Sequence, residues 1–182
     1  MNRDIDYVLY SQEQIRECVQ RLARKIEQDY AGKELVCVCI LKGGFMFMSD
    51  LVREINLPLA LDFMAASSYG SGTTSAGVVR ILKDLDKDIS GRYVLIVEDI
   101  VDTGLTLSYL RNYLKSRGAV DIAICTLLNK SERRKAKDLK VEYIGFEVPD
   151  AFVVGYGLDY DEKYRNLPYI GVLKPEVYEK DR

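Results

Sequence analysis

The sequence predicts an α/β fold, a single domain built on a mainly parallel, twisted sheet flanked by helices. Continuous apolar runs at 35–41, 94–97 and 122–128 are typical of strands that are buried on both faces, as the strands of parallel sheets are. Helices are expected after two of these runs, at about 45–55 and 105–114. Strands that alternate with helices favour a parallel sheet, so these observations together indicate the fold class.

Each expected element has a local signal. Ser11 and Gln14 have the spacing of a capping box, and apolar residues from Ile15 to Ile26 share one helical face, which predicts an amphipathic first helix. In chain order we expect a helix over 11–26, strands over 34–41, 59–65, 78–82, 94–97, 122–128, 141–148 and 169–173, helices over 45–55 and 105–114, a short helix or exposed turn within 131–140, and a terminal turn at 175–178.

No internal repeat and no long linker divides residues 1–182, so one domain is expected. We expect the first helix and the segment after Val148 to cover one edge of the sheet. Residues of about 1–10 and 149–182 are expected to form a small hood.

The composition excludes several functional classes. A chain of 182 residues with 48% apolar residues can bury a sizeable core. Its net charge of -2 gives no reason to expect nucleic-acid binding. The N-terminus lacks the apolar core of a signal peptide, and no apolar run approaches a membrane span. A cytoplasmic protein that binds neither membrane nor nucleic acid is therefore expected.

The cysteines and the absence of histidine limit the possible chemistry. All four cysteines lie in apolar-periodic segments, and we interpret them as reduced core residues: Cys18, Cys37, Cys39 and Cys125. A metal site at Cys37 and Cys39 would need further ligands, and the chain has neither a second such pair nor a histidine. Acid–base catalysis must therefore use carboxylates, Lys, Tyr, Cys or substrate groups.

The stretch at 93–107 carries the strongest functional signal. A buried strand ends here in three carboxylates and a small, hydroxyl-rich turn before a helix: Glu98, Asp99, Asp102, Thr103, Gly104 and Thr106. Charges at the end of a sheet cost desolvation energy unless a cation or polar group meets them. The free N–H groups and the dipole of a helix start favour an anion. The stretch therefore offers carboxylates for hydroxyls or a metal ion, and a cradle for a phosphate.

Two other strand ends carry lysines, and ligands of open α/β sheets bind at the carboxyl ends of strands. The turn 42–44, Lys-Gly-Gly, is either a tight turn or an anion-binding turn, and it lacks the spacing of a P-loop. Lys130 follows strand 122–128 and by itself is an ordinary surface lysine. The loop 67–77 is either an idle hairpin loop or a lid with glycine hinges. The expected co-location of the strand ends is the main physical argument for one site.

Several features also have a purely structural interpretation or a competing functional one. The basic run 133–140 is interleaved with acids and lacks aromatic residues, so a solvated face is favoured over a nucleic-acid patch. Phe152 could be a core residue, whereas Asp159 lies in an apolar segment where an acid needs a partner. The acid pair at 98–99 also resembles that of a phosphorylation receiver domain, but that interpretation leaves 102–104 unexplained.

Residues 97–107 resemble the phosphoribosyl-pyrophosphate-binding motif of the type I phosphoribosyltransferases. Other segments look, in the same order, like the members of this family that act on hypoxanthine and guanine: 41–44, 68–70, 128–130, 152–160 and 164–167. The resemblance covers nearly the whole chain. It implies a purine-salvage reaction, in which hypoxanthine or guanine attacks C1 of phosphoribosyl pyrophosphate (PRPP) and gives IMP or GMP and pyrophosphate.

The resemblance assigns roles within the 98–106 loop. Glu98 and Asp99 are expected to meet the ribose hydroxyls, directly or through Mg²⁺, and to suit the positive charge that develops on the ribose. Asp102 is expected to accept the proton from N7 of the purine as the general base. Backbone N–H and hydroxyl groups at the helix start are expected to hold the 5′-phosphate, from Thr103, Gly104, Leu105 and Thr106.

The resemblance also assigns residues outside that loop. Lys130 is expected to donate to the 6-oxo group, which excludes adenine because adenine has no acceptor there. Pyrophosphate is assigned to Lys42, Gly43 and Arg165, with the Leu41–Lys42 peptide in the cis form. The purine is assigned also to Ile100, Phe152 by stacking, Val153 and Asp159, and Asp159 is a ligand for a second Mg²⁺. A water-excluding lid is assigned to Ser68 and Tyr69.

Two other functions share part of this pattern. A phosphoribosyltransferase for another base is disfavoured by Lys130 and the 152–159 segment. A PRPP-sensing nucleic-acid-binding regulator would be expected to have a basic surface and an added nucleic-acid element, and the net charge of -2 argues against it. The family also implies a homo-oligomer, either a dimer or a tetramer.

Overall fold

A computed structural model of the chain describes residues 2–69 and 78–179, and it confirms the predicted α/β class. Its main sheet has six strands in the order β4-β3-β2-β5-β6-β7. β4 is antiparallel to β3, and the other neighbours are parallel. The strands are β2 (Leu35–Leu41), β3 (Leu59–Tyr69), β4 (Val78–Lys83), β5 (Tyr93–Val101), β6 (Asp121–Asn129) and β7 (Tyr143–Glu147).

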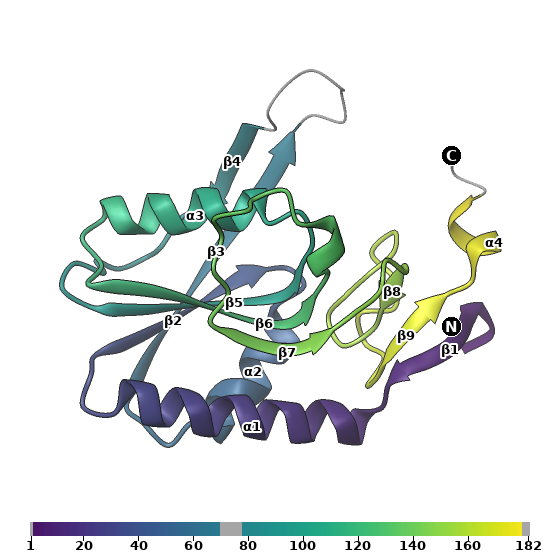
Figure 1. The fold of residues 1–182 in the computed structure, drawn as a ribbon, viewed down its shortest axis with the longest axis horizontal. Helices are drawn as coiled ribbons and strands as arrows, with labels where there is room; N and C mark the ends of the chain where they lie inside the picture. Colours follow the sequence, from purple (N-terminus) through teal and green to yellow (C-terminus); the bar gives the residue numbers. More distant parts are fainter. Residues whose placement is uncertain (1, 70–77, 180–182) are drawn as a thin grey trace.

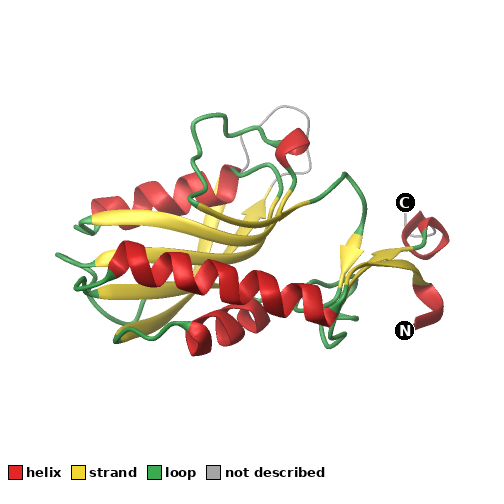
Figure 2. Ribbon diagram, turned by 60° about the horizontal axis from the view of Figure 1, so that its bottom comes forward, coloured by secondary structure: helices red, strands yellow, loops and turns green. Residues whose placement is uncertain are grey.

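Helices cover both faces of the main sheet (Figures 1 and 2). α1 (Gln12–Tyr30) and α2 (Phe45–Glu54) lie on one face, and α3 (Leu105–Ser116) lies on the other. Alternate residues of β2 and β5 pack into these two cores, because successive side chains of a strand point to opposite faces. The expectation that the first helix covers an edge was wrong, since α1 packs across a face against Cys37, Leu95 and Cys125. The predicted capping box of Ser11 and Gln14 at its start is confirmed.

The two ends of the chain form a second, smaller sheet beside the first (Figure 1). Its antiparallel strands have the order β1-β9-β8: β1 (Ile5–Tyr10), β9 (Ile170–Leu173) and β8 (Val153–Val154). The short helices η1 (Asn2–Asp4) and α4 (Pro175–Tyr178) flank this sheet in the sequence. The role of these segments as a hood over the site stays a prediction.

Several boundaries differ from those expected. Residues 66–69 belong to β3 rather than to a loop, because β3 continues its pairing with β4 as far as the Tyr69–Val78 pair. Only a 3-10 turn, η2 (Ser131–Arg133), forms within 131–140, and β7 begins at Tyr143 instead of residue 141. All four cysteines are buried free thiols, as predicted. Within the described residues, no helix is long and apolar enough to cross a membrane.

Candidate functional site

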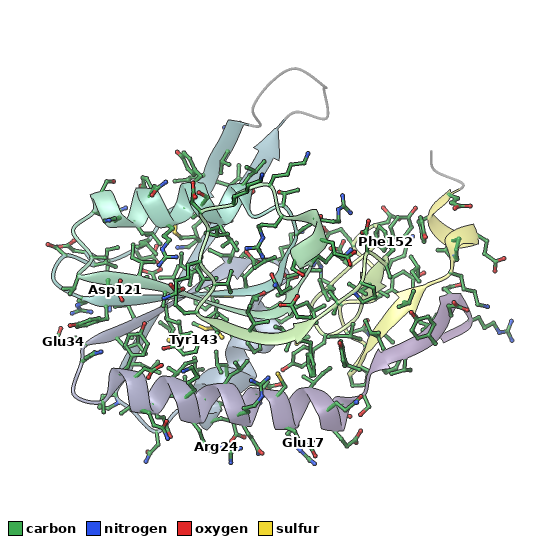
Figure 3. The ribbon with its side chains drawn as sticks, in the orientation of Figure 1. Glu17, Arg24, Glu34, Asp121, Tyr143 and Phe152 are labelled. Atoms are coloured by element: carbon green, nitrogen blue, oxygen red, sulfur yellow. The ribbon has the colours of Figure 1, made fainter. Side chains whose placement is uncertain are left out.

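A cleft of about 340 Å³ opens at the carboxyl ends of β2 and β5. Figure 3 shows this polarity: Glu34 and Asp121, at the starts of strands, lie at one end of the molecule, and Phe152 lies towards the other. The cleft brings together most of the residues predicted to bind PRPP and two predicted purine residues, Ile100 and Asp159. The predicted PRPP residues in its lining are Lys42, Gly43, Glu98, Asp99, Asp102, Thr103, Gly104, Thr106 and Arg165. The expected co-location of the first two strand ends is therefore observed.

Two adjacent acids form the floor of the cleft. Asp99 is buried with 8% exposure, Glu98 is half-buried, and neither forms an ion pair within the described residues. Burial raises the pKa of both carboxyls, and the neighbouring charge of Asp99 raises the pKa of Glu98 further. The backbone N–H of Ile100 donates to Oδ1 of Asp99 at 2.8 Å, which partly opposes the rise for Asp99. Buried acids without a direct ion-pair partner suit a ligand that brings hydroxyls or a cation.

The next turn leads into the start of α3. Gly104 is the residue before the helix, with φ of +77°, and no side chain caps this end in the described structure. A Cβ at residue 104 would lie 2.9 Å from side-chain atoms of Arg134 and Leu139, so glycine is required both by conformation and by space. The N–H groups of the first helical turn are left for a ligand, and their position favours an anion such as a phosphate.

The turn after β2 packs tightly against the acid pair. The Leu41–Lys42 peptide is cis, as the resemblance implied. A side chain at Gly43 would overlap the carboxylate of Asp99, so the turn approaches this closely only with glycine. Lys42 Nζ lies 2.9 Å from Oε2 of Glu162, a residue for which no role was predicted.

Asp102, the predicted general base, sits at the boundary between this cleft and the purine residues. Its Oδ1 is buried and accepts no hydrogen bond from the described residues. The same oxygen lies 3.1 Å from Nε of Arg133, which is an ion-pair distance without hydrogen-bond geometry. An acceptor with this geometry remains able to take a proton donor from a ligand.

Of the predicted purine residues, Ile100 and Asp159 line the cleft, whereas Lys130, Phe152 and Val153 lie beside it. Lys130 is 7% exposed and donates to the carbonyl of Ala151 at 2.7 Å and to Oδ1 of Asp150 at 3.5 Å. Arg133 contacts the same Asp150 oxygen at 3.2 Å, so Asp150 links Lys130 to the neighbourhood of Asp102. Lys130 is therefore held within a charged network beside the cleft.

Phe152 and Val153 differ in their exposure. Phe152 is 38% exposed, and its ring stacks on Tyr178 of α4 with a centroid distance of 5.0 Å. Val153 is buried in β8. An exposed aromatic ring beside Lys130 is able to stack on a planar base.

Sequence reasoning missed several residues that contact predicted site residues, among them four whose side chains meet a charged or aromatic site group: Arg133, Asp150, Glu162 and Tyr178. All four meet their partners through tertiary contacts, which no local motif records.

The predicted lid falls at the limit of the described residues. Ser68 and Tyr69 form the end of β3 and pair with Val79 and Val78, so they are strand residues and not loop residues. Their side chains and residues 70–77 lie outside the described structure, and the expected lid stays a prediction.

The three predicted magnesium ligands do not form one preformed cage. No cluster of three or more metal-binding side chains occurs within the described ranges. Glu98 and Asp99 are adjacent and form no ion pair within the described residues, whereas Asp159 is 2.9 Å from Arg165. A pair of carboxylates fits Mg²⁺, which usually takes one or two from the protein and the rest of its oxygens from substrate phosphates and water.

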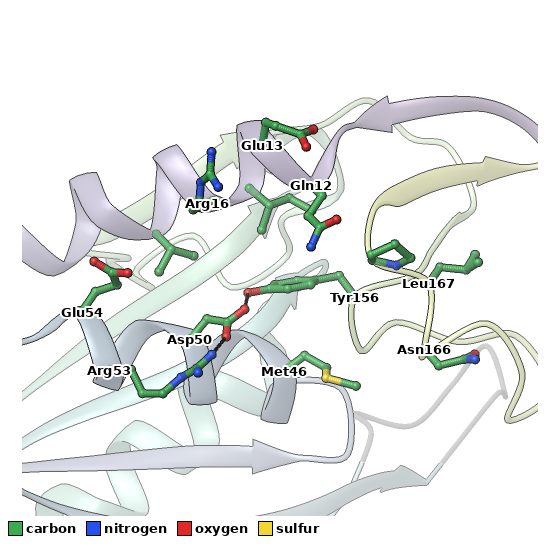
Figure 4. Close-up of a pocket in the computed structure, with 13 residues that line it drawn as sticks. Gln12, Glu13, Arg16, Met46, Asp50, Arg53, Glu54, Tyr156, Asn166 and Leu167 are labelled. Atoms are coloured by element: carbon green, nitrogen blue, oxygen red, sulfur yellow. Dashed lines mark hydrogen bonds and ion pairs between the residues drawn. The ribbon is translucent and has the colours of Figure 1, made fainter.

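A larger cavity of about 670 Å³ lies elsewhere, between α1, α2 and residues 156–168 (Figure 4). Figure 4 shows Tyr156 pointing to Asp50, to which its hydroxyl donates at 2.6 Å, and Arg53 pairing with the same carboxylate. No residue predicted to bind substrate lines this cavity. Its central polar groups satisfy one another, so the smaller cleft is the better candidate for chemistry.

Comparisons with known proteins show which family the chain belongs to. Residues 9–161 match the model of the phosphoribosyl transferase domain family. The chain is 54% identical over 179 residues to the hypoxanthine-guanine phosphoribosyltransferase of Bacillus subtilis, covering 98% of this chain and 99% of that protein. A crystal structure of a hypoxanthine phosphoribosyltransferase from Staphylococcus aureus is similar with a TM-score of 0.94 and 53% identity, covering 98% of this chain and 96% of that one. A hypoxanthine phosphoribosyltransferase from Trypanosoma cruzi, solved as a ternary substrates complex, is similar with a TM-score of 0.91 and 42% identity, covering 97% of this chain and 99% of that one.

Proposed function

The chain belongs to the phosphoribosyl transferase family, and from this premise we propose the reaction that its cleft carries out. It is a purine-salvage enzyme that transfers the 5-phosphoribosyl group of PRPP to hypoxanthine or guanine and gives IMP or GMP and pyrophosphate. The observation that carries this proposal is the convergence in one cleft of an unpaired acid pair, an uncapped helix start and a cationic turn. These groups match the hydroxyls, the 5′-phosphate and the pyrophosphate of PRPP.

The proposed mechanism breaks the bond from C1 of the ribose to pyrophosphate and forms a bond from C1 to N9 of the purine. The N–H groups at the start of α3 hold the 5′-phosphate, while Lys42 and Arg165 neutralise the departing pyrophosphate. Glu98 and Asp99 face the ribose and stabilise the positive charge that it gains as the bond breaks. Asp102 accepts the N7 proton as N9 attacks, so the product leaves as the neutral base form.

Lys130 and Phe152 select the purine in this proposal. The 6-oxo group replaces the protein acceptors that Lys130 uses in the free enzyme, Ala151 and Asp150. The 6-amino group of adenine offers no acceptor, so with adenine Lys130 would gain no ligand partner in exchange for Ala151 and Asp150. Phe152 supplies the stacking surface.

Magnesium, when bound to Glu98 and Asp99, and to Asp159 as a second site, would neutralise phosphate oxygens and hold the ribose hydroxyls. We also propose a homo-oligomer, either a dimer or a tetramer. Exposed apolar residues on the outer strands β3 and β4 support it: Leu61, Phe63 and Leu82. Size-exclusion chromatography with light scattering tests it. The four free thiols support a cytoplasmic location.

One assay tests the proposed reaction. The protein is incubated with PRPP, Mg²⁺ and hypoxanthine, guanine or adenine in turn, and nucleotide formation is followed. IMP and GMP are the expected products. Salt-dependent binding to RNA without turnover of any base would instead favour a PRPP-sensing regulator.

A further inference from the structure

Glu162 lies between the two cationic side chains that the proposed function assigns to pyrophosphate. Its Oε2 is 2.9 Å from Nζ of Lys42, and its Oε1 is 3.2 Å from a guanidinium nitrogen of Arg165. The two oxygens of one carboxylate therefore meet two different cations. A diphosphate would present separate oxygens to the same two cations.

The backbone around Glu162 is built to present it in this way. Asp161 and Glu162 have φ of 52° and 57°, in the left-handed region that residues with side chains rarely adopt. The N–H of Glu162 donates to Oδ2 of Asp159 at 3.0 Å, which fixes the turn. Unfavourable backbone conformations persist only where surrounding contacts determine them, and they concentrate at functional sites.

The surroundings of Glu162 keep its carboxylate ionised and leave its ion pairs easy for a ligand to displace. The hydrogen bond from Lys42, followed by that from Arg165, lowers the pKa of Glu162, so it is ionised at neutral pH. Its side chain is 65% exposed, and that of Lys42 is 67% exposed. Ion pairs this exposed are weak, so a ligand with more negative charge can displace them readily.

We propose that Glu162 is a built-in substitute for pyrophosphate. It holds Lys42 and Arg165 in place between turnovers, gives them up when PRPP binds, and competes for them with product pyrophosphate. The proposal rests on the proposed function, because it needs pyrophosphate to bind at Lys42 and Arg165. Its consequence is that Glu162 weakens the binding of pyrophosphate and so favours its release.

The test compares wild type with Glu162→Gln. Isothermal titration measures the dissociation constant of pyrophosphate with Mg²⁺, and a hypoxanthine assay measures inhibition by pyrophosphate. The variant is expected to bind pyrophosphate roughly 3- to 10-fold more tightly, because the side chain at 162 no longer forms ion pairs with Lys42 and Arg165. The inhibition constant should fall by the same factor, with the KM for hypoxanthine unchanged.

Asp161→Asn is the matched control. It removes the same charge from the neighbouring position, but the Asp161 carboxylate pairs with Lys163 at 2.7 Å instead of with Lys42 or Arg165. We expect its pyrophosphate affinity to stay within about twofold of wild type. Equal tightening in both variants would overturn the proposal, since the effect would then be general charge repulsion.

The remaining outcomes separate this proposal from the proposed function. If Glu162→Gln binds pyrophosphate equally well or less well than wild type, Glu162 does not compete, and the substitute role is wrong. If wild type turns over hypoxanthine but does not bind pyrophosphate at all, the pyrophosphate assignment fails and this proposal fails with it. If wild type shows no turnover with any base, the proposed function fails first.

Discussion

Residues 98–106, called the β5 loop below, comprise the end of β5, a turn at 102–104 and the start of α3. This region and the segment 150–165 supply most of the proposed site, and their acidic residues differ in whether they form ion pairs. In the β5 loop, Glu98 and Asp99 are adjacent and have no ion-pair partner within the described residues. In the 150–165 segment every acid pairs with a cation: Asp150 with Lys130 and Arg133, Asp159 with Arg165, Asp161 with Lys163, and Glu162 with Lys42 and Arg165.

This difference determines what each region must do when substrate binds. A ligand of Glu98, Asp99 and the start of α3 displaces no ion-pair partner, so these groups are preorganised, whereas Asp102 in the same region lies 3.1 Å from Nε of Arg133. A ligand of the 150–165 segment must displace an internal partner from each cation. In this proposal the 150–165 segment sets how tightly the purine and pyrophosphate bind and how readily they leave, because each must replace an internal ion-pair partner. The β5 loop stabilises the positive charge that develops on the ribose.

The largest expected effect is the selectivity for hypoxanthine over adenine. It tests whether Lys130 exchanges its protein acceptors for an acceptor on the base. A 6-oxo group can replace the carbonyl of Ala151 as the acceptor for Lys130, and an amino group cannot. We expect kcat/KM for hypoxanthine to exceed that for adenine by a factor on the order of 10⁴. Initial rates with each base measure it, and Lys130→Gln should lose most of the discrimination. Efficient AMP formation by wild type would break the assignment of the purine site.

Asp102 tests the preorganised region. Asp102→Asn keeps the shape of the side chain but removes the proton acceptor, so kcat should fall on the order of 10²-fold or more while nucleotide binding persists. Steady-state rates together with IMP titration measure the two effects. Asp138→Asn, a change at an exposed acid outside the cleft, is the control and should leave kcat unchanged. Full activity of Asp102→Asn would remove Asp102 from the base role.

The same contrast explains how far the sequence could predict the molecule. The β5 loop was predictable because its strand, acids, turn and helix start are contiguous, and each has a local physical signal. The Lys42 turn was predictable in position, and the need for glycine at 43 follows only from its close approach to Asp99 in the folded chain.

The second region was predictable only through the family resemblance. Nothing local indicates that Glu162 meets Lys42, 120 positions away in the chain, or that Arg133 lies between Asp102 and Asp150. The length of β3 also depends on a tertiary contact. β3 continues to Tyr69 because β4 offers pairing partners, although the small polar residues there are typical of a loop. Tertiary contacts decided what local composition could not.

The smallest expected effect compares the same chemical change, acid to amide, in both regions without ligand. Burial raises the pKa of Glu98 above its ordinary value of 4.5, so the unfolded state ionises at a lower pH than the folded state. The free energy of unfolding is therefore unaffected by Glu98 below about pH 4 and falls as the pH rises through the raised pKa. Glu98→Gln removes that loss, so it should stabilise the protein at pH 8 by on the order of 1 kcal/mol and much less at pH 4.

Asp150→Asn should have the opposite sign. It removes an exposed partner from Lys130 and Arg133, so we expect a loss of about 0.2–1 kcal/mol at pH 8. Urea denaturation of wild type and both variants, with Mg²⁺ and PRPP absent, measures the two changes. If both variants lose stability at pH 8, the acids of the β5 loop are compensated in the free protein, and the contrast between the two regions fails. If Glu98→Gln raises the free energy of unfolding and Asp150→Asn lowers it, the acids of the β5 loop destabilise the free protein. Such a cost is expected of groups whose role is to bind a ligand.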